Sequence, residues 1–473
     1  MSRSHRRRCA LWLCVATVGA TLSGCAVGPD YQRPPLATTD SYKELGDWKP
    51  SEPSDALSRG PWWTIYQDDT LNDLEGRVNI SNENIKAAAA SFEQARALVA
   101  QAKAGFWPTL SATFGRTRSE QPGSIPPVRT EYSVGADAAW DLDVWGSVRR
   151  TVESDRDSAE ASAALLADAQ LSAQAALATD YFQLRAQDQL QQLLDDTVAA
   201  ETRSLKITES RYKFGVAARA DVVTAETQLL SSQASQVNAR VLRGTLEHAI
   251  AVLLGQSPST FTLPRSAIRT DVPTVPPGVP STLLERRPDV ASAERKMAAA
   301  NAQIGVATAA YFPSLTLNAT GTTTDNSLRQ LFKSSTTVWS LGPQLAETII
   351  DGGLRRAQVA QAKAAYQNSV ATYRETVLTS FQQVEDEIVT LRVLEEQAVI
   401  EAKTVKAARE AEALTLNQYK AGTVPYSSVI TAQTARLSAE ETELQVLSSR
   451  LQASVSLIEA LGGAWDQSRA VVK

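Results

Sequence analysis

Cysteine, histidine and methionine are nearly absent from this sequence, which has three, two and two of them in 473 residues. It contains no phosphate-binding loop, no dinucleotide fingerprint and no zinc-type histidine pair. His248 stands in the stretch GTLEHAIAVLLG, which reads as a helix, and there a solvated or packed imidazole is the simplest reading. No pair of carboxylates is singled out either. We therefore expect no enzymatic activity, no cofactor and no metal site.

The chain also lacks an excess of positive charge, since 47 lysines and arginines stand against 52 acidic residues and the formal net charge is −5. Four of its arginines lie within the first eight residues, so the rest of the chain is more acidic still. A mildly acidic protein without a basic patch is a poor partner for nucleic acid. We expect no nucleic-acid binding.

The first 24 residues have the pattern of a secreted leader. A basic start is followed by an apolar run over residues 10–20, which is too short to span a bilayer. Leu22-Ser23-Gly24-Cys25 then resembles the cleavage site of a bacterial lipoprotein signal. This predicts a signal peptide over 1–24 and lipidation of Cys25 by a diacylglycerol and an amide-linked acyl chain such as palmitate. An ordinary secretory leader with a nearby cysteine is the alternative.

The residues around the predicted cleavage site bear on location and redox chemistry. Ala26 follows the cysteine, and the absence of an Asp there favours the outer membrane over the inner membrane. Cys9 and Cys14 would leave with the leader, and Cys25 would be consumed by lipid. No disulfide is then available.

Three pairs of similar stretches recur in the same order about 206 residues apart, which indicates a duplicated unit. GFWPTLSATFG is echoed by AYFPSLTLNATG, WGSVRRTVESD by DGGLRRAQVAQ, and RYKFGVAARADVVTAETQL by QYKAGTVPYSSVITAQTARL. We expect an extended N-terminal segment over 25–69, a first repeat over 70–263, a proline-rich linker over 264–280 and a second repeat over 281–473.

Long helices dominate each repeat. We expect them over about 146–212, 221–254, 353–420 and 426–461. Val370, Val377, Val384, Leu391, Ala398 and Val405 recur every seventh residue, with Phe381 and Ile388 between them, which is typical of a coiled-coil seam. A helix of some 65 residues would be roughly 100 Å long. A soluble bundle or a structural coiled coil would show the same pattern.

Two strands are predicted in each repeat, over about 109–118, 131–142, 314–323 and 335–346. Apolar residues alternate with polar ones over about ten positions, the length and period of a bilayer-crossing strand. Aromatic residues gather near the strand ends, as in interfacial girdles: Phe106, Trp107, Trp140, Trp145, Tyr311 and Phe312. Two hairpins packed on a soluble core remain the alternative.

Four strands cannot close a barrel, yet an open sheet in lipid leaves backbone groups unpaired. Two chains would give a filled barrel of eight strands, and three would give twelve strands with a water-filled lumen. If the strands cross a membrane, we therefore expect an oligomer, and a conducting one needs at least three subunits. The long helices would then hang from the barrel on its periplasmic side.

Several motifs resemble the TolC-like outer membrane channels of tripartite efflux pumps, in their lipoprotein (NodT-type) branch. They are CAVGPDYQRP, WWTIYQDDTLNDL, LLERRPDVASAERKMAAANAQIGVATAAYFPSL, YKAGTVPYSSVITAQ and ALGGAW. The resemblance implies an α+β membrane protein of a Gram-negative bacterium. It would be a homotrimer whose twelve-stranded β-barrel continues into a long periplasmic α-helical barrel. It also implies a periplasmic adaptor and an inner-membrane transporter, of the proton-driven RND type.

The two helix-to-helix turns are the predicted functional positions. In similar channels these tips meet the adaptor and close the duct at rest, which implies adaptor contacts by Gly215, Val216, Ala217, Arg219, Gly422, Thr423, Val424 and Pro425. The positions that match the family's gate are Ser427, Thr431 and Thr434, and none is charged. Asp221 is the acidic candidate, with helix capping as its other reading. We expect a mostly steric, hydrogen-bonded closure with Tyr426 near the constriction.

The predicted function is a passive exit duct for small molecules such as drugs or toxic compounds, driven by the inner-membrane transporter. A lipid-anchored periplasmic coiled-coil scaffold would explain the leader and the heptads but not the alternating strands. An outer membrane duct of a protein secretion system is a further alternative. The cargo and the ion selectivity are not encoded in any motif.

Overall fold

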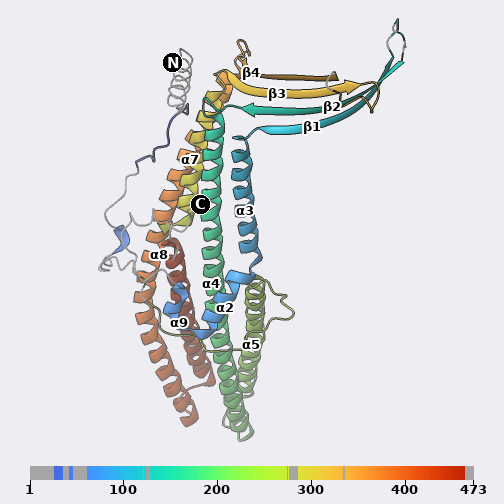
Figure 1. The fold of residues 1–473 in the computed structure, drawn as a ribbon. Coiled ribbons are helices and arrows are strands. Elements are labelled where there is room, and N and C mark those ends of the chain that lie inside the picture. Colours follow the sequence, from blue (N-terminus) through green and yellow to red (C-terminus); the bar gives the residue numbers. More distant parts are fainter. Residues whose placement is uncertain are drawn as a thin grey trace.

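A four-stranded sheet lies at one end of a long array of helices (Figure 1). The computed structural model describes residues 26–35, 42–45, 61–120, 122–123, 125, 128–273, 275, 286–333 and 336–463. The strands are β1 (Thr109–Glu120), β2 (Val128–Asp141), β3 (Ser314–Asp325) and β4 (Thr337–Ala346). They pair antiparallel in the order β1-β2-β3-β4, so β1 and β4 form the two edges of the sheet.

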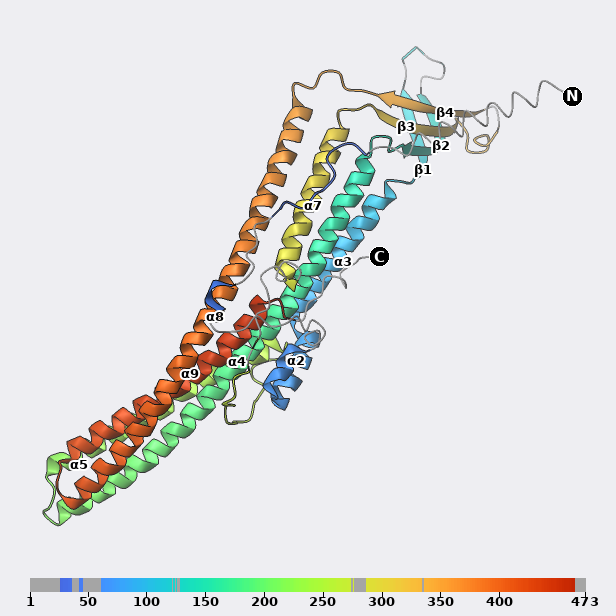
Figure 2. The same cartoon turned by 90° about the vertical axis from the view of Figure 1, so that its left-hand side faces the viewer.

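Two very long helices run from the sheet toward the opposite end of the molecule, and each returns as a shorter helix. They are α4 (Ser147–Lys213) with α5 (Arg219–Leu253), and α8 (Leu354–Ala421) with α9 (Tyr426–Ala460). Figure 2 shows the two hairpins converging at the end farthest from the sheet. At the expected seam of α8, Val377, Val384 and Leu391 are buried, so the heptad pattern is confirmed as a packing stripe.

Shorter helices pack against α4 between the sheet and the middle of its length. They are α2 (Asp69–Ser81) and α3 (Glu83–Ala104) in the first repeat and α7 (Pro288–Ala309) in the second. Asn82 separates α2 from α3 because its side-chain oxygen caps Asn84 and Ile85 while its backbone is extended. Its amide group also donates to the carbonyl of Leu253, which ties this break to the end of α5.

The two repeats start their long helices in the same way. Asp143 accepts hydrogen bonds from the backbone N–H groups of Val148 and Arg149 at the beginning of α4. Asp351 accepts from Gly353 and Arg355 at the beginning of α8. Each carboxylate satisfies helix donors that have no intrahelical partner and also pairs with an arginine of the first turn.

The N-terminal segment corrects one expectation. We expected an extended chain as far as residue 69, but the described part includes the 3-10 helices η1 (Lys43–Leu45) and η2 (Trp62–Tyr66). The aromatic side chains of η2 are buried, and burial of such rings stabilises a compact turn against α4 and α9.

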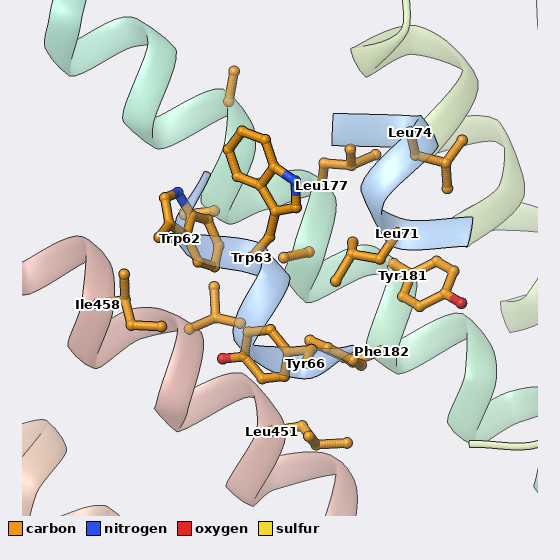
Figure 3. Close-up of a cluster of buried hydrophobic side chains, with 14 of the residues drawn as sticks. Trp62, Trp63, Tyr66, Leu71, Leu74, Leu177, Tyr181, Phe182, Leu451 and Ile458 are labelled. Atoms are coloured by element: carbon orange, nitrogen blue, oxygen red, sulfur yellow. The ribbon is translucent and has the colours of Figure 1, made fainter. Parts of the chain in front are cut away.

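The main core lies where η2, α2, α4 and α9 meet (Figure 3). Tyr66 packs on Phe182 with ring centroids 4.8 Å apart, and its hydroxyl hydrogen-bonds to Ser454. Tyr181 donates to Asp68, the N-cap of α2. This core holds η2, α2, α4 and α9 together about halfway along the helical array.

Candidate functional site

The sheet has one apolar and one polar face. Strand pairing places Leu110 opposite Ala138, Ala138 opposite Ala319, and Ala319 opposite Leu341. Paired residues point to the same side, so one apolar surface runs unbroken across all four strands. Its large side chains are exposed in the single chain, including Leu110, Phe114, Trp339, Leu341 and Leu345.

The opposite face carries small polar side chains. Asp137 is paired with Ser111 and with Thr320, and Thr320 hydrogen-bonds to Ser340 of β4. A sheet with one apolar and one hydrated face suits a wall between lipid and water.

Aromatic residues hold the junction between sheet and helices. Trp145 stacks on Phe312 with centroids 4.6 Å apart and donates its indole N–H to the carbonyl of Pro313. Trp140 donates to the carbonyl of Phe106. These rings have apolar bodies and satisfied polar groups, as residues at a membrane interface commonly do.

The predicted lipidation site, Cys25, lies outside the described residues, but the chain directly after it is fixed beside this junction. Val27 donates its backbone N–H to the carbonyl of Trp145. The buried Arg150 donates to the carbonyls of Val27 and Gly28 and to the carboxylate of Asp30. The segment therefore begins at the level of the aromatic junction.

The two turns between the long helices lie together at the far end of the molecule. Gly215 and Gly422 adopt positive φ values of 72° and 81°, which favour glycine. The backbone N–H groups of Val216 and Thr423 donate back to Arg211 and Gln418, closing both helix ends in the same way.

The predicted adaptor-contact residues are largely accessible here. Six of them are exposed, namely Gly215, Val216, Arg219, Gly422, Thr423 and Pro425, and Ala217 and Val424 are half-buried. Phe214, which the sequence reasoning did not select, is 82% exposed at the same tip.

A cluster of aromatic and cationic groups joins the two hairpins just above the turns. Arg211 donates to the carbonyl of Lys420, and its guanidinium lies 4.8 Å from the centre of the Tyr419 ring. Tyr419 meets Tyr426 edge to face at 5.2 Å and donates to Thr208. The sequence reasoning missed Arg211 and Tyr419, although both lie in the repeated RYK and QYK stretches.

Tyr426 is 1% exposed in the single chain and packs with Ala225, Tyr419 and Val429, so its ring is a core group between helices. Burial raises the pKa of its hydroxyl to about 12, so this hydroxyl is neutral.

Asp221 is in the first turn of α5, which begins at Arg219, two residues before the expected start at about 221. Its carboxylate accepts from the backbone N–H of Ala218 at 3.4 Å. The residue thus acts from inside the helix as the reciprocal half of a capping arrangement. This contact ties Asp221 to the turn itself.

The remaining gate candidates share one face of α9. Ser427, Thr431 and Thr434 are all exposed, and their spacing of four and three residues aligns them. Thr431 hydrogen-bonds to the carbonyl of Ser427, so its hydroxyl is partly used within the helix. The face is uncharged and polar.

A charged network above the tips was also missed by the sequence reasoning. Arg436 of α9 pairs with Glu412 at 2.6 Å and with Glu440, and Arg409 of α8 pairs with Glu440 at 2.6 Å. These contacts tie α8 and α9 together. Arg436 also donates to the hydroxyl of Thr197 in α4 at 3.4 Å, so the network holds the second hairpin together and contacts the first.

A cavity of about 400 Å³ lies among α4, α7, α8 and α9, with Asp168, Asp289, Glu387 and Glu459 around Arg287. Arg287 is held by Asp289 and by the carbonyl of Ala460. Burial raises the pKa of Asp168 to about 6. No group of residues suited to a metal ion is present in the part of the chain that the structure describes.

Within the described ranges, none of the helices combines the length and the apolar character needed to cross a bilayer.

Known proteins with a similar sequence share this architecture. The family model described as outer membrane efflux protein matches residues 76–256 and 279–463, one match for each repeat. The chain is 28% identical over 461 residues to the probable efflux pump outer membrane protein TtgC of Pseudomonas putida, covering 96% of this chain and 95% of that protein. It is 29% identical over 466 residues to the solvent efflux pump outer membrane protein SrpC of Pseudomonas putida, covering 95% and 97%.

Solved structures agree. The outer-membrane channel OprN matches with a TM-score of 0.85 at 30% identity, over 93% of this chain and 99% of that chain. The family match extends over most of the sequence, and the fold of four strands and long helices is that of these channels. The chain belongs to the outer membrane efflux protein family and is a non-enzymatic outer membrane channel of an efflux pump.

Proposed function

We propose that the protein works as a homotrimer, a passive duct of twelve strands and a helical tunnel. The observation that carries this is the apolar face that runs across four strands but ends at two free edges. A sheet in lipid has to satisfy the backbone groups of β1 and β4, and pairing with identical copies does so. Three copies give a barrel wide enough for water.

The helices carry matching surfaces. Large apolar side chains are exposed along α5 and along α8, on faces that no described part of the chain covers: Val223, Leu230, Val237 and Val241 on α5, and Leu378, Val393, Ile400 and Leu414 on α8. Apolar stripes of this length are normally buried in an assembly. Packing of α5 against α8 of the next subunit would cover both and extend the barrel into a tunnel.

We further propose that Cys25 carries the lipid anchor. The segment that follows it is bound at Trp145 and Arg150, so acyl chains on Cys25 would start close to the aromatic junction. An anchor there and a barrel beside it would enter the same membrane. The helices would then extend into the periplasm, where a periplasmic adaptor and an RND-type inner-membrane transporter complete the pump.

The exposed tip residues are the proposed adaptor contacts, and the uncharged face of Ser427, Thr431 and Thr434 is the proposed lining of the closed end. The cargo class is small molecules such as drugs or toxic compounds. A tethered scaffold that conducts nothing would leave the apolar face of the sheet without a role.

The test is electrical. The purified protein should migrate as a heat-sensitive trimer in detergent gels and should form discrete conducting units in planar bilayers. A monomer that stays in solution without detergent and gives no conductance would refute the trimeric duct. Cys25→Ser should abolish incorporation of labelled palmitate without abolishing the channel.

A further inference from the structure

The apolar face of the sheet, which would point outward to the lipid, changes from apolar to charged side chains partway along β1. From Leu110 to Phe114, β1 presents apolar side chains on this face, and the next two outward positions are Arg116 and Arg118. Both arginines are exposed, and neither forms an ion pair with any described residue. Two unpaired guanidinium groups on the lipid side of a strand require an explanation, because charge on that face is costly within hydrocarbon.

The position of the two arginines across the membrane can be estimated from the aromatic residues of β2. Trp140 and Tyr132 lie on the same face eight residues apart, which is roughly 27 Å along the strand. With a strand tilt of about 40°, they differ in height by roughly 20 Å, close to the apolar band of about 25 Å in such barrels. Tyr132 is paired with Arg116, so both arginines lie at or just above the second interface.

The contacts of Arg116 suit this position. Its guanidinium lies 5.8 Å from the centre of the Tyr132 ring, so it contacts an aromatic side chain of the predicted interface. Arg118 is two residues further along the strand, about 7 Å beyond it. Guanidinium groups bind phosphate oxygens in a bidentate manner, and two of them side by side suit a headgroup with more than one phosphate.

Other charges at this end do not cancel the arginines. Asp325 shares the face, but its carboxylate accepts the backbone N–H of Ser327 and so supports the turn after β3. Glu120 lies at the tip of β1, and the β3–β4 connection contributes two exposed cations. The charged residues described at this end are five cations and three carboxylates, which leaves a positive balance: Arg116, Arg118, Arg129, Arg329 and Lys333, and Glu120, Glu131 and Asp325.

We propose that Arg116 and Arg118 form a binding site for the phosphate groups of a phosphorylated glycolipid in the outer leaflet. The apolar band below them, with Phe114 and Val134, would contact the acyl chains of the same molecule. A free phosphate has no apolar part to use this surface. The inference rests on the proposed function, because the helices must lie in the periplasm for this end of the sheet to reach the outer leaflet.

The experiment compares lipid binding by the purified trimer and by variants in detergent, using native mass spectrometry. The probes are bisphosphorylated lipid A, the same lipid with its phosphates removed, and phosphatidylglycerol. The test variant is Arg116→Gln with Arg118→Gln. The matched control is Arg129→Gln, because Arg129 is at the same end of the sheet but alternates to the polar face.

We expect the double variant to bind bisphosphorylated lipid A about tenfold more weakly, whereas Arg129→Gln binds it as the unaltered protein does. Arg116→Lys with Arg118→Lys should restore part of the affinity. Equal binding by the double variant and the unaltered protein would overturn the proposal. So would equal binding of the dephosphorylated lipid or of phosphatidylglycerol.

Folding and the proposed function are controlled separately. Each variant is first checked for the heat-sensitive trimer and for conductance. If the unaltered protein shows neither, the proposed function fails. If it shows both, and the double variant keeps both but binds lipid A unchanged, the lipid site alone fails.

Discussion

The guanidinium of Arg211, near the end of α4, donates a hydrogen bond of 2.9 Å to the backbone carbonyl of Lys420, near the end of α8. The two residues are 209 positions apart, one in each repeat. The same guanidinium lies over the Tyr419 ring. This contact joins the two helical hairpins next to the turns and therefore resists their separation at the tip.

Replacing Arg211 by Met should loosen the tip. The variant loses a charged hydrogen bond that is partly exposed, which costs about 1–2 kcal/mol. We expect a higher single-channel conductance, or more frequent opening, in planar bilayers. Arg203→Met is the control, because Arg203 is an exposed residue of the same helix. Unchanged conductance in Arg211→Met would show that this contact does not restrict the duct.

Tyr426 should behave as a core residue and not as a gate. Tyr426→Ala removes a fully buried ring, at a cost of roughly 3–5 kcal/mol. Tyr426→Phe keeps the buried ring and removes only the hydroxyl, at about 1 kcal/mol. Limited proteolysis at the tip should be much faster in the Ala variant. If Tyr426→Ala increases conductance with no change in proteolysis, the ring lines the opening after all.

Glu75 of α2 should make stability depend on pH. Its side chain is 0% exposed, neither carboxylate oxygen has a hydrogen-bond partner among the residues that the structure describes, and burial raises its pKa to about 9. The folded state therefore holds this proton more tightly than the unfolded state. The contribution of protonated Glu75 to the stability of the folded state is fully present below about pH 4.5, and it is lost as the pH rises toward 9.

Glu75→Gln removes this ionisation with little change in shape. We expect the variant to be more stable than the unaltered protein at pH 8, with the difference vanishing near pH 4. Thermal unfolding followed by circular dichroism at both pH values measures this. A difference that is the same at both pH values would mean that Glu75 is ionised in the folded protein, or that another group controls the dependence.

The two faces of the sheet should respond differently to charge. Ala112→Lys places an ammonium on the apolar face in mid-strand, where lysine costs about 2–4 kcal/mol in a lipid-facing barrel position. Thr113→Lys, the adjacent residue, points to the polar face and should be tolerated. The yield of heat-sensitive trimer in outer membranes measures both. Equal yields would contradict the assignment of the faces.

The sequence alone determined the building blocks. Period two in the strands and period seven in α8 are set by local geometry, so alternating residues such as Leu110 and Phe114 and the seam of Val377 and Val384 could be identified without a structure. The repeated motifs located both turns, and Gly215 and Gly422 were readable because a positive φ favours glycine.

Only the tertiary structure decided which groups meet. Strand register placed Leu110, Ala138, Ala319 and Leu341 on one surface, and helix packing buried Tyr426 while bringing Arg211 to Lys420. The pair Arg211 and Lys420 is 209 positions apart in the sequence, and β2 and β3 come from different repeats, so no local pattern encodes these contacts. A pattern reports which side of an element is apolar, but the partner on that side is selected by the packing of the whole chain.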